Sequence, residues 1–183
     1  IQTVVTPVND APEFASGKGN YVFAAVAEDT VTAVKTVGEI AGSAFSDPKD
    51  ALSNHGADAL AGIVITENTT TSAEGHWQYS ATPTDGDSWT NISRTVSETS
   101  GIVILAGTSV RFVPNAEFNG VPGTLTYHLL ENDHANADLP AGNVIEGLYT
   151  DGKVVDVSSH KGGTTQVSVG TAVISVEKII PVN

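Results

Sequence analysis

The chain has 183 residues, 40% of them hydrophobic, which is enough to bury the core of one domain. Acidic residues outnumber basic ones 21 to 8, and the resulting net charge of -13 argues against binding to nucleic acids or anionic membranes. The absence of cysteine excludes disulfides and thiolate chemistry, and no apolar run approaches the ~20 residues of a membrane-spanning helix. Because Met is also absent, we expect a fragment of a longer chain, with any targeting signal outside it.

The composition favours β-structure, because 23 Val and only 8 Leu accompany abundant Thr, Ser and Gly. Short apolar stretches recur along the chain between turn signals, and several alternate with a period of two. We predict strands within Tyr21-Val26, Ile63-Ile65, Trp77-Tyr79, Ile102-Leu105, Val110-Val113, Leu125-Leu130, Val154-Val157 and Val167-Val176.

Turns are expected at Gly86-Asp87, Asn119-Gly120 and Asp151-Gly152. No segment has a sustained helical period, and the best helical candidate is the short Ala-rich stretch Ala57-Ala61. The fold class predicted from these patterns is all-β, an antiparallel β-sandwich of about seven to nine strands.

The two ends of the chain share a short motif, since Pro-Val-Asn occurs at residues 7–9 and again at 181–183. Each copy follows an apolar β-like segment, as expected if a tandem array were cut at the same point of two successive modules. We therefore interpret residues 1–12 as an inter-module junction strand and linker, and residues 13–183 as a single module.

Nothing in the sequence indicates an enzyme. It contains no Gly-x-Ser-x-Gly elbow, P-loop or His-Glu-x-x-His motif. The five histidines are scattered without zinc-ligand spacing. With 21 acids in the chain, a pair of carboxylates for glycoside hydrolysis can be picked almost at random, so such pairs do not indicate a glycosidase.

Acidic residues instead gather at predicted turns, where one loop can direct several oxygens at a calcium ion. The alternative is a set of solvated acidic loops that bind nothing. The candidate metal ligands, in four groups, are Asp10 with Glu28; Asp47, Asp50 and Asp58; Asp85 and Asp87; and Glu131, Asp133 and Asp138.

Several motifs resemble, in the same order, those of cadherin-like modules in giant bacterial adhesins of the RTX type. These are the junction Val8-Asn9-Asp10-Ala11-Pro12, the loop Phe45-Ser46-Asp47-Pro48 with Leu60-Ala61-Gly62-Ile63, the hairpin Trp77-Gln78-Tyr79-Ser80 with Trp89, the late strands Arg111-Phe112-Val113-Pro114 and Gly123-Thr124-Leu125-Thr126-Tyr127, and Gly162-Gly163-Thr164.

The chain departs from plain modules of this kind by an insertion of about 25 residues, roughly 131–155. Polar insertions at the end of a rigid scaffold often carry recognition. In this respect the chain is most similar to the calcium-dependent peptide-binding domain near the tip of such adhesins. The resemblance implies an extracellular module, held on a bacterial cell surface between neighbouring adhesin modules, that grips a protein C-terminus on another cell, with ligand-binding candidates Asn132, Asp133, Asp138, Asn143, Tyr149 and Asp151.

Two alternatives remain open at this point: a structural extender of the adhesin stalk and a carbohydrate-binding module. Trp77 and Trp89 could form a sugar-stacking platform, although packing within the hairpin is the simpler interpretation. Tyr149 is either a wall of the binding pocket or an anchor for the inserted segment.

Overall fold

A computed structural model describes residues 9–49, 58–86, 88–132 and 147–182. The all-β prediction is confirmed, because the regular secondary structure of the described chain is mainly strand, with one α-helix, α1 (Val37–Ala41), and one short 3-10 helix, η1 (Gly42–Ala44). The strands are β1 (Glu13–Phe14), β2 (Tyr21–Phe23), β3 (Val26–Ala27), β4 (Lys35–Thr36), β5 (Phe45–Ser46), β6 (Leu60–Asn68), β7 (Gly75–Ser80), β8 (Thr90–Asn91), β9 (Gly101–Leu105), β10 (Ser109–Pro114), β11 (Leu125–Glu131), β12 (Val154–Val155), β13 (Ala172–Val176) and β14 (Ile179–Ile180).

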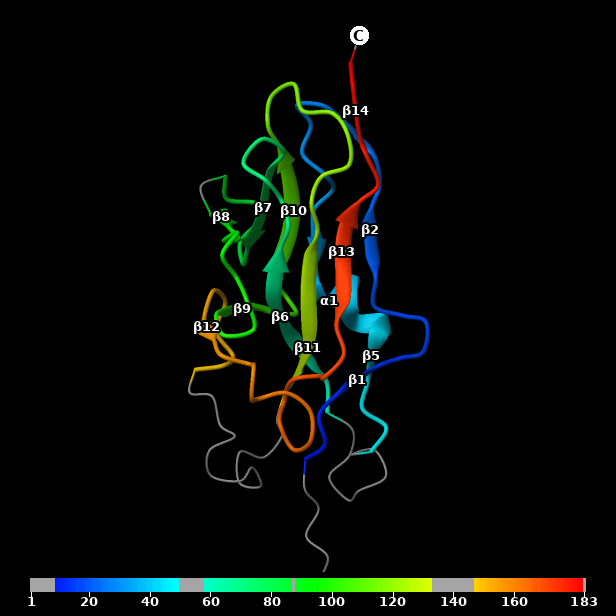
Figure 1. The fold of residues 1–183 in the computed structure, drawn as a ribbon, viewed down its shortest axis with the longest axis vertical. Helices are drawn as coiled ribbons and strands as arrows, with labels where there is room; N and C mark the ends of the chain where they lie inside the picture. The colour runs from blue at the N-terminus through cyan, green and yellow to red at the C-terminus, as the bar shows by residue number, and fades with distance from the viewer. Residues whose placement is uncertain (1–8, 50–57, 87, 133–146, 183) are drawn as a thin grey trace, which may run out of the picture.

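Two large sheets form the body of the molecule. One has four strands in the order β4-β10-β7-β8, and the other has six in the order β12-β9-β6-β11-β13-β2. The pairs β1-β5 and β3-β14 form two small sheets. In Figure 1 the long strands run close to the long axis, with β1 in the lower part of the molecule and β14 at its upper end.

The mainly antiparallel arrangement has two exceptions. Strand β2 runs parallel to β13, and β3 runs parallel to β14, while the other strand pairs in the described chain are antiparallel. Neighbours joined by a hairpin must be antiparallel, but β2 and β13 come from opposite ends of the chain and run in the same direction along the sheet edge (Figure 1).

One hydrophobic core is shared by the two large sheets. The Trp77 ring of β7 lies 5.2 Å from Phe112 of β10 and 5.7 Å from Phe23 of β2, so it joins the four-stranded sheet to the six-stranded one. Along β11 the alternate side chains of Leu125, Tyr127 and Leu129 belong to the same core, as the two-residue period of a strand requires.

The six-stranded sheet is apolar on its other face as well. Val64, Val103 and Leu130 form a second cluster there, which is covered by apolar side chains from the end of the insertion and from the segment after it, namely Leu148, Val155, Val157 and Val167. This double burial explains the nearly continuous apolar runs of β6 and β9.

The helix lies elsewhere than predicted. Leu60 and Ala61, within the predicted helical stretch, belong to β6, and position 57 lies outside the described residues. Helix α1 starts instead after Thr36, whose hydroxyl accepts from the Glu39 backbone N–H while the Glu39 carboxylate accepts from the Thr36 N–H. This capping box was the sequence signal for the helix.

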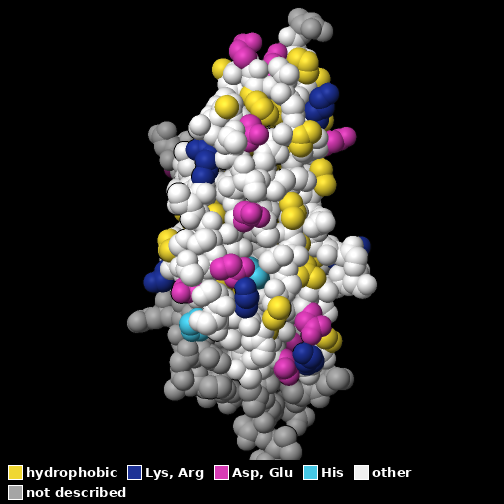
Figure 2. Space-filling view, viewed as in Figure 1, with side chains coloured by type: hydrophobic (Ala, Val, Ile, Leu, Met, Phe, Trp, Pro, Cys, Tyr) yellow, Lys and Arg dark blue, Asp and Glu magenta, His cyan; other side chains and the backbone are white. Residues whose placement is uncertain are grey.

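A polar network built on buried His128 lies on the outer face of the six-stranded sheet. The Nδ1 atom of buried His128 lies 2.8 Å from the Ser168 carbonyl oxygen, and its Nε2 atom lies 2.9 Å from Glu98. The second carboxylate oxygen of Glu98 accepts from Lys161. Figure 2 shows an acidic, a histidine and a basic side chain adjoining on this face.

The buried position of Trp77 leads to a first prediction. Trp77→Phe should lower the free energy of unfolding by ~1–3 kcal/mol, because it leaves a cavity and removes the indole hydrogen bond to the Gly123 carbonyl. Trp89→Phe, at a half-exposed position, should cost less than about 1 kcal/mol. Urea unfolding of both variants makes the comparison, and equal losses would contradict the assignment of Trp77 alone to the core.

Glu98 leads to a second prediction. Burial opposes ionisation of this carboxyl, but hydrogen bonds from Lys161 and His128 and their charges leave its pKa below the usual value of 4.5. Such a group stabilises the fold above its unfolded pKa, and the stabilisation disappears as the pH falls through the folded value.

At pH 7 we therefore expect Glu98→Gln to lower the free energy of unfolding by roughly 0.5–1 kcal/mol. The expected loss is small because the side chain is 39% exposed and solvent screens its charge. The difference from the unmodified protein should shrink below pH 4.5, measured by thermal melting across pH. Glu67→Gln, an exposed position on the same sheet, is the matched control. A constant difference at all pH values would contradict the charge-based account.

Candidate metal centre

Three carboxylates from separate parts of the chain meet at one end of the six-stranded sheet. Asp47 directly follows β5, Asp58 lies two residues before β6, and Glu131 is the last residue of β11. One carboxylate oxygen from each of the three lies within 4.8 Å of the others. Strands β6 and β11 pair antiparallel, so the start of one and the end of the other lie side by side.

The position of Glu131 follows from the alternation along β11. It continues the stripe of Leu125, Tyr127 and Leu129, so its side chain falls on the core side of the sheet and is fully buried. A register shift between Leu130 and Glu131, where Glu131 pairs with Leu60, marks a bulge at this point. Bulges re-aim side chains next to functional sites.

Hydrogen bonds hold the carboxylates of Asp47 and Glu131. Oδ2 of Asp47 accepts from the Asp58 backbone N–H at 2.8 Å, and Oε1 of Glu131 accepts from the Asn9 side-chain amide at 2.8 Å. The Tyr149 hydroxyl donates to the Glu131 backbone carbonyl at 3.0 Å. The arrangement thus ties the N-terminal segment, two loops and the end of β11 to one point.

The chemistry of this cluster suits a hard cation. Glu131 is fully buried and Asp47 only 6% exposed, so their charges lose hydration and repel one another in a low-dielectric environment. A divalent cation among the oxygens reverses that balance, and carboxylates are ligands that hard cations prefer. Asp47, Asp58 and Glu131 could therefore hold a metal ion.

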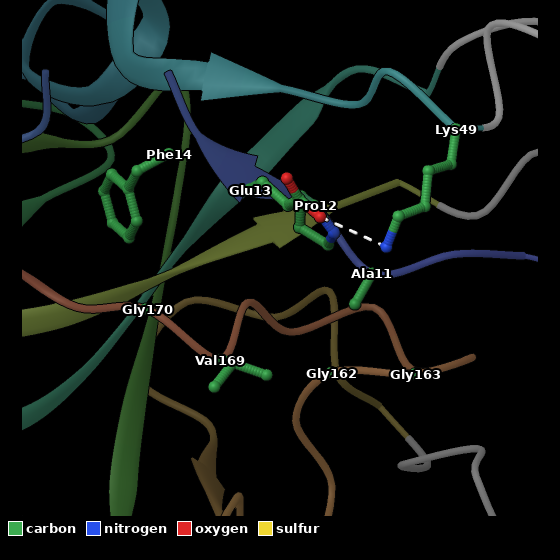
Figure 3. Close-up of a pocket in the computed structure, with 9 residues that line it drawn as sticks. All are labelled: Ala11, Pro12, Glu13, Phe14, Lys49, Gly162, Gly163, Val169 and Gly170. Carbon is green, nitrogen blue, oxygen red and sulfur yellow. Dashed lines mark ion pairs between the residues drawn. The ribbon is translucent and has the colours of Figure 1, made fainter. Parts of the chain in front are cut away.

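A pocket of about 370 Å³ is lined by chain segments that adjoin those of this centre, and its residue Glu13 pairs with Ser46, the residue before Asp47. Its walls are the segment Ala11–Phe14 on one side and residues around Gly163 and Val169 on the other, with Lys49 at the rim (Figure 3). The Lys49 ammonium lies 3.1 Å from Glu13, and the Ala11 N–H donates to the Gly163 carbonyl at 2.8 Å.

The pocket and the metal centre share chain segments. Lys49 is two residues beyond Asp47, and Ala11 is two residues beyond Asn9. The amide of Asn9 reaches both Glu131 and the carbonyl of Thr165, close in sequence to Gly163. An ion that orders the carboxylates would therefore also order the pocket walls.

The predicted metal ligands separate into three sets. Asp47, Asp58 and Glu131 come together, whereas Asp10, Glu28 and Asp85 are not part of that group. The Glu28 carboxylate accepts from the Val182 N–H beside β14, which lies at the upper end of the molecule in Figure 1. The remaining predicted ligands lie outside the described residues: Asp50, Asp87, Asp133 and Asp138.

The predicted ligand-binding residues that the structure describes all make contacts within the fold. Asn132 exchanges hydrogen bonds with Ala59 through its side chain and backbone, and Tyr149 anchors to Glu131. Both carboxylate oxygens of Asp151 accept hydrogen bonds, from the Leu105 N–H at 2.7 Å and the Thr108 hydroxyl at 2.6 Å. Asn143, with Asp133 and Asp138, lies outside the described residues.

Sequence reasoning missed Asn9 and Lys49. Asn9 stands in the junction motif beside Asp10, and the sequence singled out only its acidic neighbour. Its role depends on the fold, which brings it across to Glu131, 122 positions later in the chain.

Comparison with protein-family models, with curated proteins and with solved structures finds no match to this chain. Among the described residues, no helix has the length and apolar character needed to cross a membrane.

The triad predicts a stabilising metal. Adding a divalent cation to chelator-treated protein should raise the melting temperature, with ~2.7 kcal/mol of added stability at a hundredfold excess over the dissociation constant. Asp58→Asn and Glu131→Gln should remove this response. Because Asp58→Asn also relieves repulsion among the carboxylates, we expect it to be no less stable than the unmodified protein in chelator.

Asp85→Asn, a change of the same kind outside the triad, should retain the full metal response. If the triad variants still respond to metal like the unmodified protein, the ion binds elsewhere. If they lose equal stability with and without metal, the defect is one of packing.

Proposed function

We propose that this chain is a non-enzymatic, calcium-dependent adhesion module of a larger bacterial surface protein, and that its metal-bearing end binds the C-terminus of a peptide or protein on a target cell. The observation that carries the proposal is the convergence of Asp47, Asp58 and Glu131 beside the pocket in Figure 3. The resemblance of the sequence motifs to cadherin-like adhesin modules supports it.

Calcium is the ion that the donor set favours. The triad offers carboxylate oxygens alone, without the imidazole or thiolate ligands that zinc and copper prefer. Calcium accepts six to eight oxygens in flexible geometry, so carboxylates held by loops and a strand end suit it better than Mg²⁺, which requires a near-ideal octahedron.

A carboxylate ligand is plausible at this end despite the net charge of -13. A bound cation with an open coordination position reverses the local field and can accept a carboxylate oxygen. The pocket beside it is lined partly by Phe14 and Val169, which suit an apolar side chain next to a terminal carboxylate. Lys49 at the rim is paired with Glu13, so the attraction for the carboxylate comes from the cation.

A second function, that of a structural extender in a stalk, is favoured by one contact. Asn9, which lies in the junction-like segment, donates its amide hydrogen bond directly to the triad. Metal at this position would stiffen the segment by which the chain enters the module. The small sheets containing β1 and β14 lie toward opposite ends of the molecule (Figure 1), as serial linkage requires.

The two functions are separated by a binding experiment. A library of short peptides with free or amidated C-termini is presented to the protein in calcium and in chelator. We expect binding of free-acid peptides in calcium only, because the terminal carboxylate is the group that the cation accepts. Equal binding of amidated peptides would contradict carboxylate capture.

Val169→Glu places a repelling charge in the pocket and should abolish peptide binding while leaving the calcium-induced rise in melting temperature intact. Val22→Glu is the matched control. The exposed fraction is 66% for Val169 and 58% for Val22, but only Val169 lines the pocket. Stabilisation by calcium without binding of any peptide would favour the extender.

A further inference from the structure

Arg111 occupies the middle of the outer face of the four-stranded sheet. Its strand, β10, lies between β4 and β7, and the neighbouring side chains of Val110 and Phe112 are buried in the core. Strand alternation therefore directs Arg111 away from the core, onto the opposite face of the sheet.

Two side chains contact the guanidinium group of Arg111, and a third supports one of them. Its Nε–H donates to Oε1 of Gln78 at 2.9 Å, and Gln78 in turn donates to Oδ1 of Asn91 at 3.0 Å, so the chain of hydrogen bonds crosses β10, β7 and β8. The guanidinium carbon lies 3.8 Å from the centre of the Trp89 ring. A cation-π contact and a hydrogen bond together orient the group before any ligand arrives.

This arginine has no carboxylate partner among the described residues, although the chain carries 21 acids and 8 basic residues. Within the described chain, its terminal Nη atoms make no hydrogen bond, so the forked edge that suits a carboxylate remains available. Burial lowers the pKa of nearby His76, and the charges of Arg94 and Arg111 add to that shift.

We propose that this face, made of His76, Gln78, Trp89, Asn91 and Arg111, binds an acidic saccharide through its carboxylate. Arg111 would form the two-pronged hydrogen bond with the carboxylate. The amides and the neutral imidazole would exchange hydrogen bonds with sugar hydroxyls, and exposed parts of the indole would pack on sugar C–H groups. The site lies on another sheet from the metal centre and is independent of the proposed peptide binding.

The surrounding charges favour a saccharide over an acidic peptide. The side chains around Arg111 are neutral amides, an imidazole and an indole, which match a ligand with one carboxylate among many hydroxyls. A segment rich in Asp and Glu would bring several charges to a protein of net charge -13, where Arg111 offers the free fork and Arg94 is bound to backbone carbonyls.

Sialyllactose, with one carboxylate, and neutral lactose are the probes, titrated by NMR into the full chain in chelator below its melting temperature. We expect sialyllactose alone to bind and to shift the signals of Trp89 and its neighbours. Arg111→Gln should weaken binding about tenfold to a hundredfold, the range of a lost charge-assisted hydrogen-bond pair. Arg111→Lys should weaken it similarly, because lysine keeps the charge but loses the fork.

Lys178→Gln, which removes one exposed positive charge elsewhere, is the matched control and should leave binding unchanged. Melting temperatures of the variants show whether each one is folded. Equal binding of lactose, or full binding by folded Arg111→Gln, would overturn the proposal. Binding of a Glu-rich peptide in place of sialyllactose at Arg111 would assign the face to a protein partner and overturn it too.

Discussion

The repulsion among three converging carboxylates is the constraint on which this end of the molecule depends. Glu131 occupies a position that the pattern of β11 would otherwise give to an apolar side chain, and a buried charge there destabilises the fold unless positive charge compensates it. Departures from the hydrophobic pattern of a strand are expected mainly at functional or strained sites. A cation would connect Asn9, the loop after β5 and the end of β11, and so determine the order of the pocket walls.

Strand periodicity was readable from the sequence, but the meeting of the carboxylates was not. Asp47 and Asp58 belong to one acidic cluster and Glu131 to another, and the sequence treats these as separate candidate sites. Their convergence depends on the pairing of β6 with β11 and on the bulge beside Leu130, which tertiary packing determines. Once β11 is known to extend to residue 131, strand alternation places the Glu131 side chain on the core face of the sheet. Alternation does not predict which loops lie next to that side chain.

The inserted segment illustrates a different limit of sequence reasoning. Its polar residues suggested recognition, yet Asp151 and Tyr149 connect it to β9 and β11, and the apolar residues that follow cover the outer face of the six-stranded sheet. A short polar motif looks the same whether its hydrogen bonds go to a ligand or to the backbone. Leu148 and Val155 were the sign that part of this segment packs against the sheet.

The metal centre and the Arg111 face differ in the charge that the chain itself supplies: negative at the metal centre and positive at Arg111. At the metal centre, negative charge is concentrated and buried, so an external cation is needed before an anionic ligand can approach. At Arg111 the positive charge belongs to the chain, and Trp89 and Gln78 hold it ready without metal. Under the two proposals, chelation should therefore affect the sites differently: it removes the attraction proposed for a carboxylate at the pocket and leaves that of the guanidinium unchanged, provided that the four-stranded sheet stays folded.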